Sequence, residues 1–253
     1  MRFVINLLLF SLTCSATVLL ADTSPTDQRR TLIEQLTENP GEEGIQRKAR
    51  SIAVLEARNI PYIERLPVIA DTDQSLRREE SAIVKRLVAL AIVAVKGETG
   101  DHKLGPDLLE QFQAREFLTP LELGFMNDPT PSQHDMIQFV WRYESAWVMF
   151  WALGFRDTLG PEDQIADVPW MADLLLKEGT AGLMEKAQLR SQAEILDATD
   201  LIYRMHWAVT DARINNEIMP GGLDGSIVYE RHYSLNWLIG YADLAWDDMA
   251  TDT

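Results

Sequence analysis

Beyond an apolar N-terminal segment, apolar side chains recur along the chain at steps of three and four residues. This spacing gathers them on one face of a helix, whereas no stretch of useful length alternates apolar with polar residues as a strand would. Helices are therefore expected over residues 26–37, 45–57, 72–96, 132–153, 189–214 and 226–245. The predicted fold class is all-α: a single compact multi-helix domain over residues 22–253, with its core at roughly 45–253 and little or no β structure.

Residues typical of helix caps and turns indicate where a further helix begins and where loops lie. Thr119 is followed by Pro120 and Glu122, the threonine cap, first-turn proline and third-position glutamate that begin a helix. Loops are expected at 127–131 and 160–169. The glycine-rich stretch 220–225 lacks the spacing and the lysine of a phosphate-binding loop, so it is interpreted as a turn.

Residues 139–154 are apolar nearly all round, which predicts a central buried helix rich in aromatic residues. Its only charged side chains, Arg142 and Glu144, point ~200° apart and cannot pair with each other. Each needs a partner on another element, because an unpaired buried charge is very costly. Arg231 is the preferred partner of Glu144, with Arg190 or Arg204 as alternatives, and we expect a buried polar cluster of Arg142, Glu144, Arg204 and Arg231. The cluster is either a structural ion pair between helices or a pocket in which Glu144 acts as an acid or base.

The helix expected over 189–214 has one charged side and one apolar side. Its charged residues fall within an arc of about 120°, which favours a solvated face; they are Arg190, Glu194, Asp197, Asp200, Arg204 and Asp211. Three of them, Glu194, Asp197 and Asp200, are also weak candidates for a divalent-cation site. His206 lies on the apolar side, as either a satisfied core histidine or a catalytic base.

The N-terminus has the order of a secretory signal: Arg2, then an apolar run, then small residues. Cleavage is expected after Ala21, with Ala16 as the second choice. A periplasmic or secreted protein is therefore predicted. A retained anchor, or a lipid anchor at Cys14, stays open as an alternative.

The amino-acid composition and net charge exclude several kinds of site and make one class of partner unfavourable. A single cysteine excludes a disulfide framework, a cysteine zinc site and an iron–sulfur cluster. A formal net charge of −16 makes nucleic acid an unfavourable partner, because phosphate would be repelled. No nucleotide, zinc-protease or serine-hydrolase motif occurs, so no cofactor is expected.

An ordered series of segments carries a resemblance to a known family: Arg47–Ser51 with Leu66 and Pro67, Arg77–Ala89, Trp141–Glu144 with Phe150–Gly154, Arg190 with Glu194–Asp197, Asp200–Arg204 with Trp207 and Ala208, Glu230–Trp237, and Trp246–Thr253. Together they resemble the bacterial family known as domain of unknown function 4272, over most of the mature chain. The resemblance implies that the charges set among the tryptophans belong to a shared scaffold. It implies no reaction and no catalytic residues.

Three functions from different classes are compatible with the sequence. The leading hypothesis is a non-enzymatic exported protein that binds a basic protein partner through its acidic surface. The second is a hydrolase or lyase that uses Glu144 with Arg231 or His206 in a buried pocket. The third is a divalent-cation protein that uses the three carboxylates of the 189–214 helix.

Overall fold

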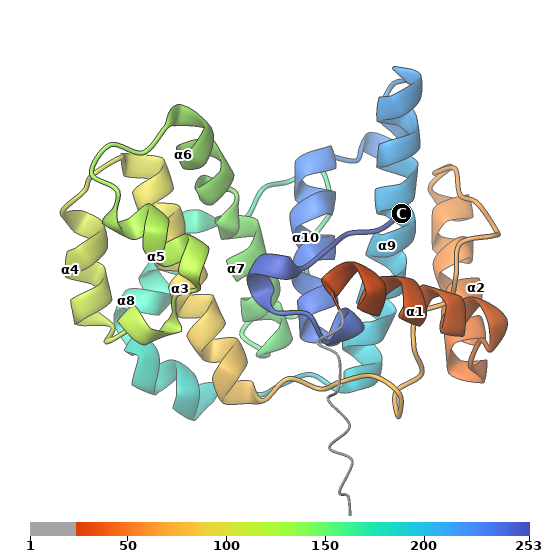
Figure 1. Cartoon of the computed structure of the whole chain (residues 1–253), viewed down its shortest axis with the longest axis horizontal. Coiled ribbons are helices and arrows are strands. Elements are labelled where there is room, and N and C mark those ends of the chain that lie inside the picture. The colour runs from red at the N-terminus through yellow and green to blue at the C-terminus, as the bar shows by residue number, and fades with distance from the viewer. Residues whose placement is uncertain (1–23) are drawn as a thin grey trace, which may run out of the picture.

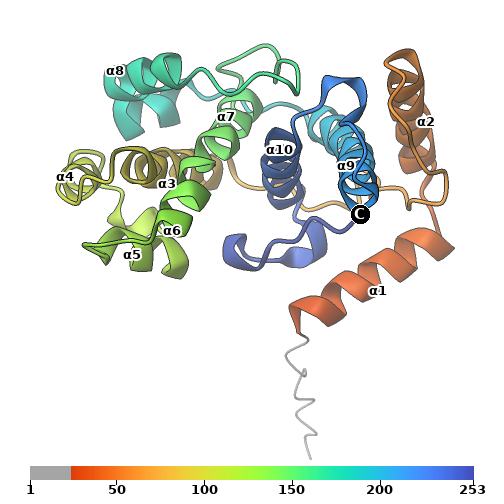
Figure 2. The same cartoon turned by 90° about the horizontal axis from the view of Figure 1, so that it is seen from above.

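Five helices lie side by side in the order α2, α9, α10, α7 and α3 and form the centre of the molecule (Figure 2). The computed structural model describes residues 24–253. All regular structure in that range is helical, as predicted: α1 (Pro25–Glu38), α2 (Glu42–Ala57), α3 (Glu80–Thr99), α4 (Leu104–Gln111), η1 (Arg115–Phe117), α5 (Pro120–Asn127), α6 (Gln133–Val140), α7 (Arg142–Ala152), α8 (Val168–Lys186), α9 (Gln192–Asn215), η2 (Pro220–Gly222), α10 (Gly225–Leu238), η3 (Tyr241–Asp243) and η4 (Trp246–Asp248).

The remaining helices flank this row (Figure 1). Helices α4, α5, α6 and α8 pack against α3, while α1 crosses the C-terminal segment and contacts η3. No helix of the described part of the chain is long and apolar enough to cross a membrane. The expected signal, with Cys14, Ala16 and Ala21, lies outside the described residues, so export stays a prediction.

Helix α7 is the buried central helix that its sequence indicates. Every residue from Tyr143 to Ala152 is buried, and Met149 and Phe150 are completely inaccessible to solvent. A helix with no exposed face needs neighbours on all sides, and α3 and α10 pack against it from two of them. Removing this much apolar surface from water is the main favourable term in the folding of the domain.

Two of the expected helix boundaries were wrong, because residues next to them make close contacts with other parts of the fold. The helix expected from residue 72 begins only at Glu80. The preceding stretch is held in turns by contacts to other elements: Asp71 accepts from the backbone N–H of Gly44, and Arg78 donates to the carbonyls of Trp237 and Leu244. The last helix ends at Leu238 rather than 245, because Gly240 takes a left-handed conformation (φ 66°) where a side chain would collide with Leu76.

The sequence pattern also predicted one helix where the structure has two, and it did not predict two other helices. The helix expected over 132–153 is two helices, α6 and α7, that meet at Trp141. Helix α4 was not predicted. Nor was α8, although Asp167 caps it and Pro169 stands in its first turn. Gly179, at φ 61°, kinks α8 and interrupts the periodicity that would have revealed it.

Lys96 shows how a buried charge holds two elements together. Its side chain is fully buried in α3, and its Nζ donates to the carbonyls of Phe125 (2.7 Å), Met126 (3.1 Å) and Asp128 (2.7 Å). These carbonyls stand at the C-terminal end of α5, where a helix has no internal donors for them. The lysine therefore closes the end of α5 and fixes it against α3.

We predict that Lys96→Met lowers the free energy of unfolding by about 3 kcal/mol, because it leaves buried carbonyls without a donor. Chemical denaturation followed by circular dichroism measures the change. Lys85→Met is the control, since Lys85 lies on the same helix with an exposed side chain. An equal loss in both variants would contradict this role of Lys96.

Candidate functional site: buried polar pairs and a cleft beneath α1

The interface between α7 and α10 contains two pairs of charged side chains, in which Glu144, Glu230 and Arg231 are buried and Arg142 is half-buried. Arg142 Nη1 lies 2.9 Å from Glu230 Oε2, and the Ser145 hydroxyl donates to the same oxygen. Glu144 Oε2 lies 3.6 Å from Arg231 Nε, so Glu144 has the expected partner. As the helical geometry requires, Arg142 and Glu144 each pair across the interface and not with each other.

The Glu144–Arg231 pair also anchors the loop between α7 and α8. Glu144 Oε1 accepts from the backbone N–H of Ala166, and Arg231 donates to the carbonyl of Gly160 (2.9 Å). Burial raises the pKa of Glu144, and the Ala166 N–H and Arg231 oppose that rise. A cavity of about 170 Å³ adjoins Glu144, lined otherwise by Val140, Trp141, Tyr143, Ile165, Ala166 and Val168.

This geometry favours anchoring over acid–base chemistry at Glu144. Neither Arg231 nor His206 lines the small cavity, so the groups of the hydrolase or lyase hypothesis do not converge on one space. Both oxygens of Glu144 face groups of the protein, the Ala166 N–H and the Arg231 guanidinium. The pair therefore accounts for the path of the loop over α7 and α10.

Arg204 stands apart from that cluster. It makes a two-pronged contact with Asp200 one turn earlier, at 2.9 and 2.7 Å, and both side chains are fully buried. The solvated face expected for α9 was therefore wrong at these two positions. A bidentate arginine–carboxylate pair satisfies both charges inside the protein, and the Arg204 Nη2 also reaches the carbonyl of Pro67 (3.3 Å).

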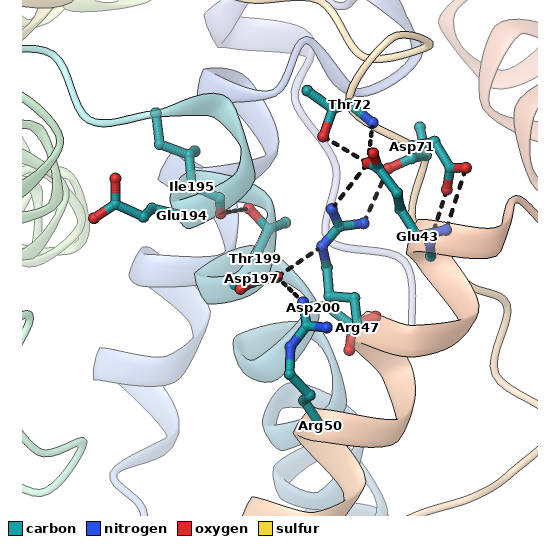
Figure 3. A network of polar contacts seen from close by, with 12 residues as sticks. Glu43, Arg47, Arg50, Asp71, Thr72, Glu194, Ile195, Asp197, Thr199 and Asp200 are labelled. Atoms are coloured by element: carbon teal, nitrogen blue, oxygen red, sulfur yellow. Dashed lines mark hydrogen bonds and ion pairs between the residues drawn. The ribbon is translucent and has the colours of Figure 1, made fainter.

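Asp197 of α9 joins α2 through two arginines (Figure 3). Arg47 Nε donates to Asp197 Oδ1 at 3.0 Å, and Arg50 Nη2 donates to the same oxygen at 2.6 Å. Arg47 is buried, and its Nη1 donates to the carbonyl of Ala70. Next to it, Asp71 accepts from the first N–H groups of α2, which has no cap from its own sequence.

The three candidate metal ligands are engaged separately. Glu194 bonds the N-cap Ser191 and Arg190, Asp197 bonds the arginines of α2, and Asp200 bonds Arg204. The described residues contain no group of three or more histidine, cysteine or carboxylate side chains that could hold a metal ion. Each carboxylate already has a cationic partner in the protein.

His206 has a partner that the sequence reading did not foresee. Its Nδ1 lies 2.9 Å from Nδ1 of His232 on α10, and both rings are buried. Burial lowers the pKa of His206 to about 4, with a further contribution from Arg213, and burial lowers that of His232 well below its usual value. Both rings are therefore neutral near pH 7. One useful signal was in the sequence, since two histidines on apolar helix faces each need a hydrogen-bonding partner.

A cavity lined by residues of several elements lies beneath α1. It has a volume of about 370 Å³ and forms a cleft, not a sealed void. Its walls are α1 (Leu32, Ile33, Leu36), the segment 67–70 with Gln74, Ser75 and Leu76, the α9–α10 pair (Tyr203, His232, Asn236, Ile239), and the C-terminal segment (Gly240, Tyr241, Ala242, Asp243, Asp252). Most of these side chains are apolar, and His232 is the member of the histidine pair that reaches the wall.

The roof of the cleft is tied down at its rim. Arg29 of α1 lies 2.8 Å from Asp252 Oδ1, and the Tyr241 hydroxyl donates to the other oxygen at 2.9 Å. The floor is the rigid pair α9–α10. Because the cleft forms only where α1 and the C-terminal segment meet this pair, no periodicity within one helix could have revealed it.

The family of the chain follows from its sequence. The family model for domain of unknown function 4272 matches residues 47–249. The chain belongs to this family. In this member of the domain of unknown function 4272 family, the ion pairs between α7 and α10 and the helices at the floor of the cleft lie within the matched range. Helix α1 and Asp252 lie outside it. No curated protein and no solved structure matches the chain.

The buried histidine pair predicts a pH dependence of stability. Between about pH 4 and about pH 6.5, His206 binds a proton in the unfolded chain but not in the folded protein. The free energy of unfolding therefore falls as the pH falls, and His206 contributes about 2 kcal/mol of that loss between about pH 7.5 and about pH 5.

His206→Leu should reduce this pH-dependent loss by about 2 kcal/mol. Urea denaturation of the wild type and the variant at both pH values measures it. His134→Leu serves as the control, because His134 is exposed on α6. An unchanged pH dependence in His206→Leu would show that His206 is not held neutral in the fold.

Proposed function

We propose that this protein is a non-enzymatic binding protein that takes a small, largely apolar molecule into the cleft beneath α1. The observation that carries the proposal is the cleft itself, at about 370 Å³ with mostly apolar walls and a few polar groups at its floor and rim. Ligand sites in proteins are commonly concave, mostly apolar and about 300–1,000 Å³ in volume, with a few placed polar groups that fix orientation.

Two further features bear on the proposal: one supports binding of a ligand, and the other concerns where that binding takes place. The polar side chains on the floor, among them His232 and Asn236, are held by contacts to other residues: His232 to His206, and Asn236 to the carbonyl of Ala250 (2.8 Å). A site whose polar groups are already positioned loses less entropy when a ligand arrives. The signal expected at Met1–Ala21 would place this binding outside the cytoplasm, and export forms part of the proposal.

The test measures the binding of a neutral apolar fluorophore, such as N-phenyl-1-naphthylamine, by the wild-type protein and by a variant in which a larger side chain fills the cleft. The wild-type protein should bind the dye and raise its fluorescence. Ile33→Trp on α1 places a larger side chain into the cleft, so it should weaken binding roughly tenfold or more, a loss of about 1.4 kcal/mol.

Leu176→Trp is the matched control, because Leu176 is 59% exposed on α8 and does not line the cleft. It should bind the dye as the wild type does. Absence of dye binding to the folded wild type, or equal binding by wild type and Ile33→Trp, would overturn the proposal.

A second function, recognition of a basic protein, has its own observation. Within residues 24–253, the buried charged side chains are balanced in sign, five basic against five acidic: Arg47, Arg86, Lys96, Arg204 and Arg231, and Glu122, Glu144, Glu162, Asp200 and Glu230. The formal charge of −16 is therefore carried outside the core. An acidic surface of this kind attracts basic partners and accelerates their encounter.

Captured partners should be released by salt if this attraction drives binding. The protein is immobilised and exposed to bacterial envelope extract at about 0.05 M and about 0.5 M salt, where the screening length falls severalfold. A basic protein retained at low salt and lost at high salt is the expected result. Capture that does not depend on salt, or no capture, would contradict electrostatic recognition.

A further inference from the structure

The polar floor of the cleft is built from neutral groups. His232 of α10 lines the cleft, and its Nδ1 lies 2.9 Å from Nδ1 of His206, so Nε2 is the ring nitrogen that this contact does not engage. The ring of Tyr203 lies against that of His232, with centroids 5.6 Å apart. Burial raises the pKa of Tyr203 to about 12, so its hydroxyl keeps its proton near pH 7.

The contact between the two histidines controls what His232 offers to the cleft. Only one proton fits between the two Nδ1 atoms when both rings are neutral. If His206 supplies it, His232 carries its own proton on Nε2 and acts as a donor. If His232 supplies it, Nε2 is an acceptor. The pair therefore offers the cleft either a donor or an acceptor without acquiring a charge.

We propose that the ligand of this cleft is an uncharged molecule with an apolar body and a hydroxyl group, and that His232, supported by His206, binds the hydroxyl. This inference rests on the proposed binding function and names its ligand class. A hydroxyl is both a donor and an acceptor, so it pairs with His232 in either arrangement of the shared proton. A pure hydrocarbon would leave Nε2 without a partner, at a cost in affinity.

The charges around the cleft exclude an anionic ligand. Two carboxylates, Asp243 and Asp252, stand at its rim, and none of the residues that the described structure places along its walls is lysine or arginine. Three arginines contact residues of the walls, and each is already paired with a carboxylate: Arg29 with Asp252, Arg47 with Asp197 and Arg204 with Asp200. A carboxylate or phosphate entering the cleft would lose its hydration and gain no cationic partner in return.

Three ligands of similar shape test this on the unmodified protein: naphthalene, 2-naphthol and 2-naphthoate, each titrated against bound N-phenyl-1-naphthylamine. 2-Naphthol should displace the dye roughly tenfold more tightly than naphthalene, as expected for one added hydrogen bond. 2-Naphthoate should be the weakest of the three.

His232→Leu should bring the affinities of 2-naphthol and naphthalene together, while His134→Leu keeps the wild-type ratio. Since the ratio is measured first in the wild type, a folding defect of His232→Leu does not leave the inference without a test. Equal affinities for naphthol and naphthalene in the wild type, or tighter binding of naphthoate, would overturn the ligand class alone. Failure of the dye itself to bind would overturn the proposed function.

Discussion

The fold depends on the cost of burying charge between α7 and α10. Four ionised groups lie at this one interface, and each would be strongly unfavourable without its partner. Arg142 and Glu144 on one helix face Glu230 and Arg231 on the other, so the signs match in only one register. Sliding either helix by one residue would break both pairs. The charges thus act less as a source of stability than as a device that selects one packing of an otherwise apolar helix. The same groups then fix the loop that follows α7.

The neighbouring helix–helix interfaces also contain contacts between polar side chains, but the chemical groups differ. Between α2 and α9, arginines meet a carboxylate at the surface; between α3 and α7, the Tyr143 hydroxyl donates to Glu98 at 2.7 Å. The α9–α10 interface instead uses a contact between two neutral groups, the imidazoles of His206 and His232. That interface is also the floor of the cleft. A neutral pair suits a floor that meets an apolar occupant, because an ion pair there would keep its water and resist desolvation.

The sequence was sufficient for features that arise within one helix or between its faces. The all-α class, the buried character of α7 and the need of Glu144 for an outside partner all follow from helical geometry. It was insufficient where an element is defined by contacts from far along the chain. The helix expected from residue 72 begins only at Glu80, and Asp71, just before the expected start, caps α2 instead. Asp200 and Arg204 looked solvated by periodicity, although each neutralises the other in the interior. The cleft has no local signature, because segments far apart in the sequence create it.

The walls of the cleft lie partly inside and partly outside the range that the family model matches. The floor helices belong to the range that defines the family, whereas α1 and Asp252 lie beyond its two ends. The two ends of the described chain meet in a single ion pair over the opening. Substitutions in this roof would alter the shape of the opening while leaving the packed row of helices untouched.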